Sequence, residues 1–278
     1  MQFFKKIFFV LSMPFLLLAG CSSNFTKILK SKDYEYKFKK AEEYYAAKNY
    51  KNAETLYQEL FPVFKGSDKF EELYYKYAYC SYYLGNYEDA ENLFKSYLGV
   101  FPNSNKAEEI AYMHAYTFYK QSPNVQLDQT NTTKAIGMMQ GFINSYPNSP
   151  RDTEATQLIA KCRAKLEEKD YMAAKLYFNL ELYQAAGICF SNLLLNYPDS
   201  PFGDEYMLMA VKSNYEYAKS SIFDKQEERY GKVTSEYFDF EDRYPNSKLL
   251  KEAESYKNLS QNNIKKIQNE QIKASTNL

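Results

Sequence analysis

Small and large apolar residues follow one another along this chain at a spacing that fits packed helices. Five small residues are each followed, four positions later, by an aromatic or long apolar residue: Ala53 and Tyr57, Ala90 and Phe94, Ala135 and Met139, Ala186 and Phe190, Val233 and Tyr237. Residues four apart share one helical face, so a neighbouring helix can approach at the small residue and pack against the large one. The pattern predicts helices packed in antiparallel pairs.

The small positions also recur along the chain at fixed distances. Ala78 is followed by Ala90 after 12 residues, by Pro102 after 12 more and by Ala115 after 13 more. The same distances separate the members of two further series: Ala135, Pro147 and Ala160, then Ala186, Pro198 and Val211. A repeated helix pair of this kind predicts an all-α solenoid of about five tetratricopeptide-like pairs over residues 33–245, with a closing helix from about Lys248. The low content of Gly and Pro, 9 of each, favours the same class.

Similar proline phrases separate the predicted pairs: "FPNSN" at 101, "YPNSP" at 146, "YPDSP" at 197 and "YPNSK" at 244. Proline cannot continue a helix, and the serine two residues later is a good N-cap for the next one. Ser149 with Asp152 resembles a capping box. Residues 121–133 are expected to form an extended linker, and the run from Pro150 to about Asn179 has no breaker and predicts one long helix joining two halves of the solenoid.

The first residues read as an export signal. Lys5 and Lys6 precede an apolar run, residues 7–18, that is too short to span a bilayer. Leu18-Ala19-Gly20-Cys21 then resembles the lipobox of bacterial lipoproteins, whose cysteine is acylated; a secreted chain with a chance cysteine is the alternative. We expect residues 1–20 to be removed, acyl groups on Cys21 to anchor the protein without spanning, and residues 21–32 to be a tether reaching at most about 35–40 Å.

The residues after Cys21 bear on location and partners. Ser22 follows the cysteine and no acidic residue occurs before Asp33, which by resemblance to lipoprotein sorting patterns favours the outer membrane and its periplasmic face. The mature chain would hold 33 basic and 35 acidic residues. A net charge near −2 argues against a nucleic-acid partner, which needs a basic face.

The chain offers little for catalysis, so we expect no enzyme, no metal and no cofactor. His114 is the only histidine, and no nucleotide-binding, metalloprotease or hydrolase motif occurs. The acidic doublets are interpreted as solvated positions rather than paired catalytic acids: Glu71-Glu72, Glu108-Glu109, Glu167-Glu168 and Glu227-Glu228. For Cys80, Cys162 and Cys189, buried thiols are favoured over a disulfide, which stays open.

Tyrosine is unusually dense in the first three predicted pairs. The first helix of each tetratricopeptide pair lines a concave groove that binds extended peptides. Counting −3, +1, +4 and +5 from Ala41, Ala78 and Ala115 places these residues at the groove: Phe38, Glu42, Tyr45, Tyr75, Tyr79, Tyr82, Tyr83, Tyr112, Tyr116 and Tyr119. The alternative is that these rings pack between helices.

The lipobox, the helix pairs and two long phrases resemble the BamD family, the β-barrel assembly lipoproteins of the outer membrane, in the form typical of Bacteroidetes. The phrases are "TKAIGMMQGFINSYPNSP" and the stretch from "AKCRAKLEEKDY" to "SNYEYA". The resemblance implies that N-terminal repeats, residues 33–148, bind C-terminal segments of unfolded outer-membrane proteins. It implies that C-terminal repeats, residues 149–257, dock the barrel-forming subunit for membrane insertion.

One position departs from that family. Some relatives carry an arginine in the second helix of the fourth pair that pairs with an acid of the barrel subunit, and Cys189 stands there in this chain. Docking is therefore expected around Glu181, Tyr183 and Gln184. Residues 258–278 are expected to be a polar tail, either a frayed helix or disordered.

Two other functions stay open. A tetratricopeptide scaffold lipoprotein of cell-envelope machinery, serving pili or peptidoglycan, would show the same periodicity because one fold supports many partners. A glycan-binding lipoprotein on a related helical scaffold fits poorly, since sugar platforms favour tryptophan and the chain has none.

Overall fold

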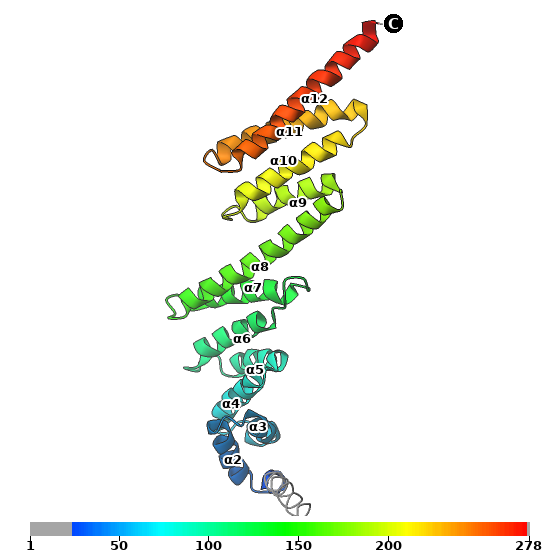
Figure 1. Cartoon of the computed structure of the whole chain (residues 1–278). Coiled ribbons are helices and arrows are strands. Elements are labelled where there is room, and N and C mark those ends of the chain that lie inside the picture. Colours follow the sequence, from blue (N-terminus) through cyan, green and yellow to red (C-terminus); the bar gives the residue numbers. More distant parts are fainter. Residues whose placement is uncertain (1–23, 277–278) are drawn as a thin grey trace, which may run out of the picture. The chain divides into compact units, whose positions relative to one another are not determined.

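Every regular element in the described part of the chain is a helix. The computed structural model describes residues 24–276, so the signal segment and Cys21 lie outside it. The helices follow one another in chain order (Figure 1): α2 Tyr34–Ala46, α3 Tyr50–Phe64, α4 Phe70–Tyr83, α5 Tyr87–Val100, α6 Ala107–Gln121, α7 Thr130–Ser145, α8 Asp152–Asn179, α9 Tyr183–Asn196, α10 Gly203–Lys219, α11 Phe223–Arg243 and α12 Leu250–Thr276. This confirms the all-α class and its consecutive helix pairs.

The chain forms two compact units, Met1–Cys162 and Arg163–Leu278, whose division falls inside α8. The sequence placed a boundary between residues 148 and 149, before that helix. The uninterrupted helix expected to about Asn179 is present as α8, Asp152–Asn179. Its first part packs within unit 1 and its second part within unit 2.

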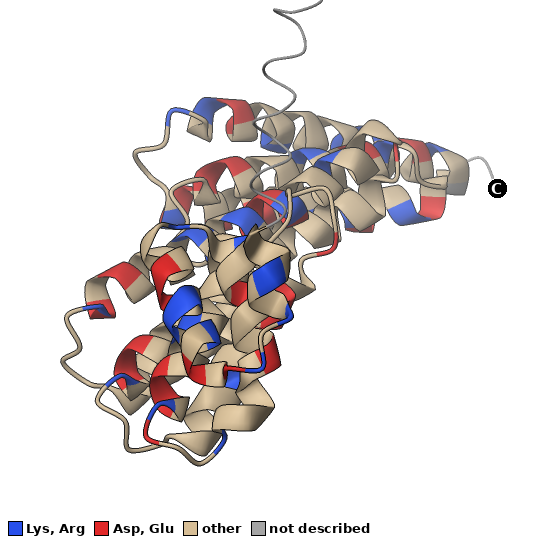
Figure 2. Ribbon diagram, turned by 90° about the horizontal axis from the view of Figure 1, so that it is seen from below, with Lys and Arg blue, Asp and Glu red and all other residues tan. Residues whose placement is uncertain are grey.

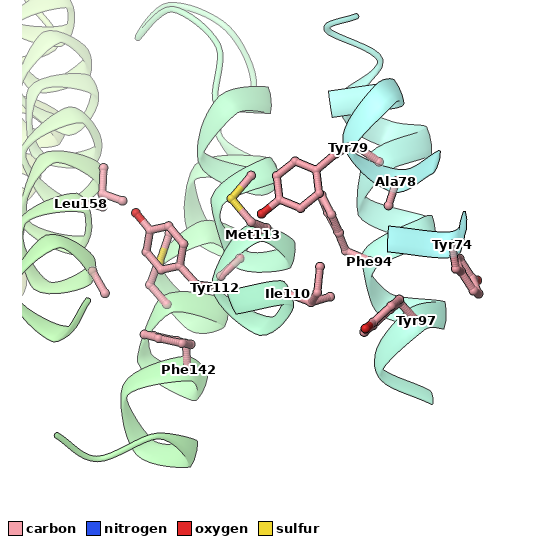
Figure 3. Packing of buried hydrophobic residues seen from close by; sticks show 14 of the residues in the cluster. Tyr74, Ala78, Tyr79, Phe94, Tyr97, Ile110, Tyr112, Met113, Phe142 and Leu158 are labelled. Carbon is pink, nitrogen blue, oxygen red and sulfur yellow. The ribbon is translucent and has the colours of Figure 1, made fainter. Parts of the chain in front are cut away.

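The core of unit 1 is built by the predicted alternation of small and large residues. Ala53 and Ala90 are fully buried, as are Tyr57 and Phe94 four residues later. Figure 3 shows Tyr79 and Phe94 extending from the α4–α5 pair toward Met113 and Ile110 of α6. Full burial of a large apolar side chain contributes about 1.5–3 kcal/mol, so these rings stabilise both the helix pair that holds them and its contact with the next.

Unit 2 repeats the alternation, and one position predicted on α8, the helix that enters both units, is corrected. Phe190 and Tyr237 are buried four residues after Ala186 and Val233. Ala160, counted as the next small position after Pro147, is exposed; Ala174, 12 residues before Ala186, is the buried one. The second half of α8, rather than the first, pairs with α9. A helix without a breaker hides this boundary from sequence counting.

The proline phrases end helices as expected, but their serines do not cap the next helix. The helix α6 begins at Ala107 with Lys106 at its N-cap, beyond Ser104. The hydroxyl of Ser104 instead accepts the N–H of Lys106 at 3.0 Å, and the serines at 149, 200 and 247 each accept the N–H two residues later at 3.1 Å. These serines therefore close a turn before the helix.

The expected capping box does not form either. The Oδ1 atom of Asp152 is buried and has no hydrogen-bond partner within the part of the chain that the structure describes. The side chain of Ser149 instead contacts Arg151 and Glu108.

Both ends of the described chain are more ordered than expected. Residues 24–29, inside the expected tether, are helical; Ile28 is buried, and the Phe25 ring lies 5.7 Å from that of Tyr44. The expected frayed or disordered tail continues α12 to Thr276. It is held because Ile267 is buried in a cluster with Tyr230.

Candidate functional site

Tyrosines of the first three helix pairs form one continuous set of ring contacts, which we call the tyrosine array. Tyr50, at the start of α3, lies 5.7 Å from Tyr45 and stacks on Tyr83 at 4.4 Å between ring centroids. Tyr82 and Tyr116 then join α4 to α6 at 6.3 Å. The array comprises Tyr45, Tyr50, Tyr75, Tyr79, Tyr82, Tyr83, Tyr112, Tyr116 and Tyr119. Tyr50 was missed from the sequence because it belongs to a second helix of a pair.

Members of the array differ in exposure. Tyr83 is 48% exposed, whereas Tyr79 is 6% and Tyr112 2% exposed. The remaining members are half-buried: Tyr45, Tyr50, Tyr75, Tyr82, Tyr116 and Tyr119. Tyr79 and Tyr112 therefore support the surface from beneath, while Tyr83 and the half-buried rings form it.

Phe38, placed with these residues by sequence counting, lies elsewhere. Its ring packs on Phe64 at 5.3 Å between centroids, and Lys69 lies over it at 5.5 Å. Among the described residues its ring contacts are with the α3 side of the first pair rather than with the tyrosines of α4.

Glu109 of α6 fixes two hydroxyls of the array. Tyr75 donates a hydrogen bond to its carboxylate at 3.0 Å, and Tyr79 donates to the same oxygen. Burial, with the nearby charge of Glu109, raises the pKa of Tyr75 to about 12. Burial likewise raises the pKa of Tyr82 to about 12. The hydroxyls of Tyr75 and Tyr82 are therefore neutral hydrogen-bond donors at neutral pH.

Ion pairs connect the first helices of successive repeats at a constant interval. Glu35 pairs with Lys69, Glu42 with Lys76 and Glu72 with Lys106, each lysine lying 34 residues after its acid. The ammonium groups also cover the array: Lys106 lies 4.4 Å from the centre of the Tyr75 ring and Lys76 5.5 Å from that of Tyr45. Figure 2 shows the resulting mixture of acidic and basic positions along the ribbon.

Each of the four acidic doublets has a half-buried member that makes a specific contact, Glu227 with Gln268 at 2.8 Å among them. The interpretation as solvated positions is wrong for those members and holds for the exposed Glu168 and Glu228. Glu71 accepts hydrogen bonds from Ser104 at 2.6 Å and Tyr97 at 2.8 Å. The proline-phrase serines at 149, 200 and 247 donate in the same way to Glu108, Glu167 and Asp204. The distance of 33 residues recurs from Glu71 to Ser104 and from Glu167 to Ser200, and it is the sequence signal from which these contacts could have been predicted.

The hydrogen bonds from Ser104 and Tyr97 hold the pKa of Glu71 below its usual value. Its carboxylate is therefore charged in the folded protein, and the hydrogen bond from each donor is charge-assisted. In the second and later pairs, such bonds fix the first helix to the turn that precedes the next pair.

In unit 2 the predicted docking residues lie together at the turn between α8 and α9. Glu181, Tyr183 and Gln184 line a surface depression of about 350 Å³ with Leu182 and Tyr217. Leu182, Ile188 and Leu195 are exposed on the same helix and turn. Cys189 is half-buried, and burial raises the pKa of its thiol.

His114 and the three described cysteines, the side chains most able to carry chemistry, have structural surroundings. The His114 Nε2 lies 3.0 Å from Glu91, and its ring contacts Phe118. Cys80, Cys162 and Cys189 are free thiols, so the disulfide alternative is not realised among them. Within residues 24–276 no group of three His, Cys, Asp or Glu side chains could hold a metal ion. None of the helices described there has the length and apolar content to cross a membrane.

Comparison with known proteins gives the family. No curated protein matches the chain. A tetratricopeptide-repeat protein of Bacteroides fragilis is similar in structure, with 14% identity, coverage of 83% of this chain and 99% of that one, and a TM-score of 0.39. The TPR2AB domain of yeast Sti1, solved as a complex with pHSP90, has 11% identity, coverage of 82% and 98%, and a TM-score of 0.37.

A family model is decisive. The model for YfiO, described as an outer membrane lipoprotein, matches residues 30–229, which is more than half of the chain. The match begins beside the helical stretch 24–29, covers the tyrosine array and ends within α11. The chain therefore belongs to the YfiO family of outer membrane lipoproteins, the BamD family that its sequence resembles.

Proposed function

We propose that the protein is a non-catalytic, lipid-anchored adaptor of β-barrel assembly on the periplasmic face of the outer membrane. Unit 1 binds C-terminal segments of unfolded outer-membrane proteins on the tyrosine array. Unit 2 docks the barrel-forming subunit around Glu181, Tyr183 and Gln184. Family membership supports the general role, and the array supports the client site.

The tyrosine array is the observation that carries the client site. Its rings offer apolar faces with polar tips, which suits a wet surface that must hold both aromatic side chains and peptide backbone. The ion pairs and Glu109 hold these rings in place before a client arrives, which lowers the ordering cost on the protein side. The unfolded client still loses conformational entropy, so binding should be moderate and exchangeable.

Peptide titration tests this site. The double variant Tyr83→Ala/Tyr116→Ala removes two accessible rings and should weaken binding of a labelled barrel C-terminal peptide about tenfold in fluorescence anisotropy. The matched control is Tyr34→Ala/Tyr36→Ala, which removes two exposed tyrosines of α2 outside the array. Equal effects of the two double variants, or no effect of the first, would contradict the proposed client site.

Co-purification tests the docking site and separates the two candidate roles. From detergent-solubilised membranes, a β-barrel with several periplasmic domains should co-purify, and Tyr183→Ala/Gln184→Ala should reduce its recovery. Recovery of pilus or peptidoglycan components in its place would favour the scaffold alternative.

The anchor is tested by the mass of the mature protein. We expect mature protein purified from membranes to begin at Cys21 with acyl groups attached, and Cys21→Ser to release it into the soluble fraction. A mature protein without added acyl mass would refute the anchor and leave the peptide titration unaffected.

A further inference from the structure

Three lysines at the start of the described chain are exposed and lack carboxylate partners. Lys27, Lys30 and Lys32 make no ion pair among the described residues. The two acids that follow are engaged elsewhere: Asp33 accepts the N–H of Tyr36 at 2.9 Å, and Glu35 pairs with Lys69. Residues 24–32 therefore carry three positive charges and no negative one, whereas the rest of the mature chain holds 30 basic and 35 acidic residues.

This basic segment is fixed to unit 1 and is not a free tether. Ile28 is buried in the core of the first helix pair, and Phe25 and Leu29 pack against that core. Residues 25, 28 and 29 share one side of the helical stretch, so Lys27 and Lys30 extend from the other side into solvent.

Covalent geometry limits how far the segment can lie from the membrane. Three peptide units join Cys21 to Asn24, which allows at most about 11 Å between their Cα atoms. At physiological ionic strength charges interact over about 8 Å before they are screened. An acylated Cys21 would thus hold Lys27, Lys30 and Lys32 near the phospholipid headgroups.

We propose that Lys27, Lys30 and Lys32 form a second membrane contact that binds the phosphates of anionic phospholipids. The inference rests on the proposed anchor at Cys21. The exposed rings of Tyr34 and Tyr36, which directly follow, have the amphipathic character of side chains found at membrane interfaces. Each lysine near an anionic surface strengthens binding about fivefold. The contact orients the first helix pair against the membrane, which acyl chains on a flexible tether would not do.

A single tryptophan can report this contact, because the chain has none of its own. The acylated Tyr34→Trp protein is incorporated into vesicles of phosphatidylethanolamine with or without phosphatidylglycerol, in which the lipid chains are brominated near the headgroup. We expect quenching of the tryptophan in the anionic vesicles and much less in the neutral ones. About 1 M salt, which shortens the screening length to about 3 Å, should abolish the difference.

Charge variants decide whether the three lysines are responsible. Lys27→Gln/Lys30→Gln/Lys32→Gln should abolish the difference between anionic and neutral vesicles. The matched control, Lys65→Gln/Lys95→Gln/Lys161→Gln, removes three exposed lysines elsewhere in unit 1 and should leave it unchanged. Val100→Trp in α5 serves as the distant reporter and should not be quenched.

The outcomes separate this contact from the proposed function. Equal quenching in both vesicle types, or quenching that survives the first triple substitution, would overturn the lipid contact while leaving the anchor intact. A protein that fails to float with the vesicles at all would disprove the anchor, and the lipid contact would fall with it. Neither result affects the peptide titration.

Discussion

The hydroxyl of Ser104 donates a hydrogen bond of 2.6 Å to the carboxylate of Glu71, which lies 33 residues earlier in the chain. Ser104 belongs to the proline phrase after α5, and Glu71 lies in the first turn of α4. Tyr97 of α5 donates to the same oxygen at 2.8 Å. One carboxylate therefore joins both ends of a helix pair.

Removing this carboxylate should destabilise unit 1. Glu71→Ala removes the charged acceptor of the Tyr97 and Ser104 hydroxyls, which keep only their mutual contact at 3.0 Å. Hydrogen bonds to charged groups contribute about 1–3 kcal/mol. We expect a lower urea midpoint by circular dichroism. The control is Glu88→Ala, an exposed acid in the first turn of α5, which should change the midpoint little. A midpoint for Glu71→Ala equal to that of the control would show that the contact is not stabilising.

The same carboxylate should make stability depend on pH in acid. Hydrogen bonds from Ser104 and Tyr97 lower the pKa of Glu71 in the folded state from its ordinary 4.5. The unfolded state therefore binds more protons in this range, so the stabilisation is present above pH 4.5 and is lost as the pH falls through the folded pKa. Urea midpoints measured between about pH 6 and pH 3 should fall less steeply for Glu71→Gln than for the unchanged protein. Parallel curves would contradict the shift.

Glu236 of unit 2 should show the opposite sign. Burial raises its pKa, although Asn214 donates hydrogen bonds to both carboxylate oxygens at 2.7 and 2.9 Å. The folded state then holds its proton longer than the unfolded state, so stability is lost as pH rises from 4.5 through the folded pKa. Glu236→Gln mimics the protonated form and should gain in urea midpoint, relative to the unchanged protein, between about pH 4 and pH 7. A constant difference across that range would refute the prediction.

A close approach in unit 2 gives a steric prediction. A Cβ added at Gly203, the first residue of α10, would lie 2.1 Å from the hydroxyl oxygen of Tyr244. Gly203→Ala should therefore lower stability by about 1–3 kcal/mol through overpacking. Gly231→Ala in α11, where nothing lies within 4 Å, should instead stabilise the helix by up to about 1 kcal/mol. Thermal unfolding measures both.

Relief of the clash provides the control for Gly203. Combined with Tyr244→Leu, which removes the hydroxyl and the ring, Gly203→Ala should cost less than it does alone. Additive effects in this double-mutant cycle would place the cause elsewhere.

The helix pairs could be predicted because their signal is local. Ala53 and Tyr57 are four residues apart on one helix, and both are fully buried as the spacing requires. The fourth pair is harder to predict: α8 contains no breaker, so counting places the small position at Ala160, whereas Ala174 fills it. Continuous helix leaves no mark in the sequence where its packing partner changes.

The tyrosine surface could be located from the sequence but not resolved into individual roles. Counting from Ala78 gave the same status to Tyr79 and Tyr83, yet Tyr79 is buried against Phe94 at 5.3 Å and Tyr83 is exposed. The difference depends on the neighbouring helix, which periodicity within one helix does not describe. The serines of the proline phrases were misassigned as caps for the same reason, since their partners are acids of another helix.

The constant interval of 34 residues between paired side chains has a consequence for how chains of this type can change in length. Losing one residue of α4 before Lys76 would turn that lysine about 100° around its helix and away from Glu42. Insertions should therefore survive only outside such intervals. Added length should be tolerated between Glu109, the partner of Tyr75, and Tyr171, the partner of Glu205. The loop 122–129 and the first half of α8 both lie in this stretch, where extra residues leave the two pairings in register.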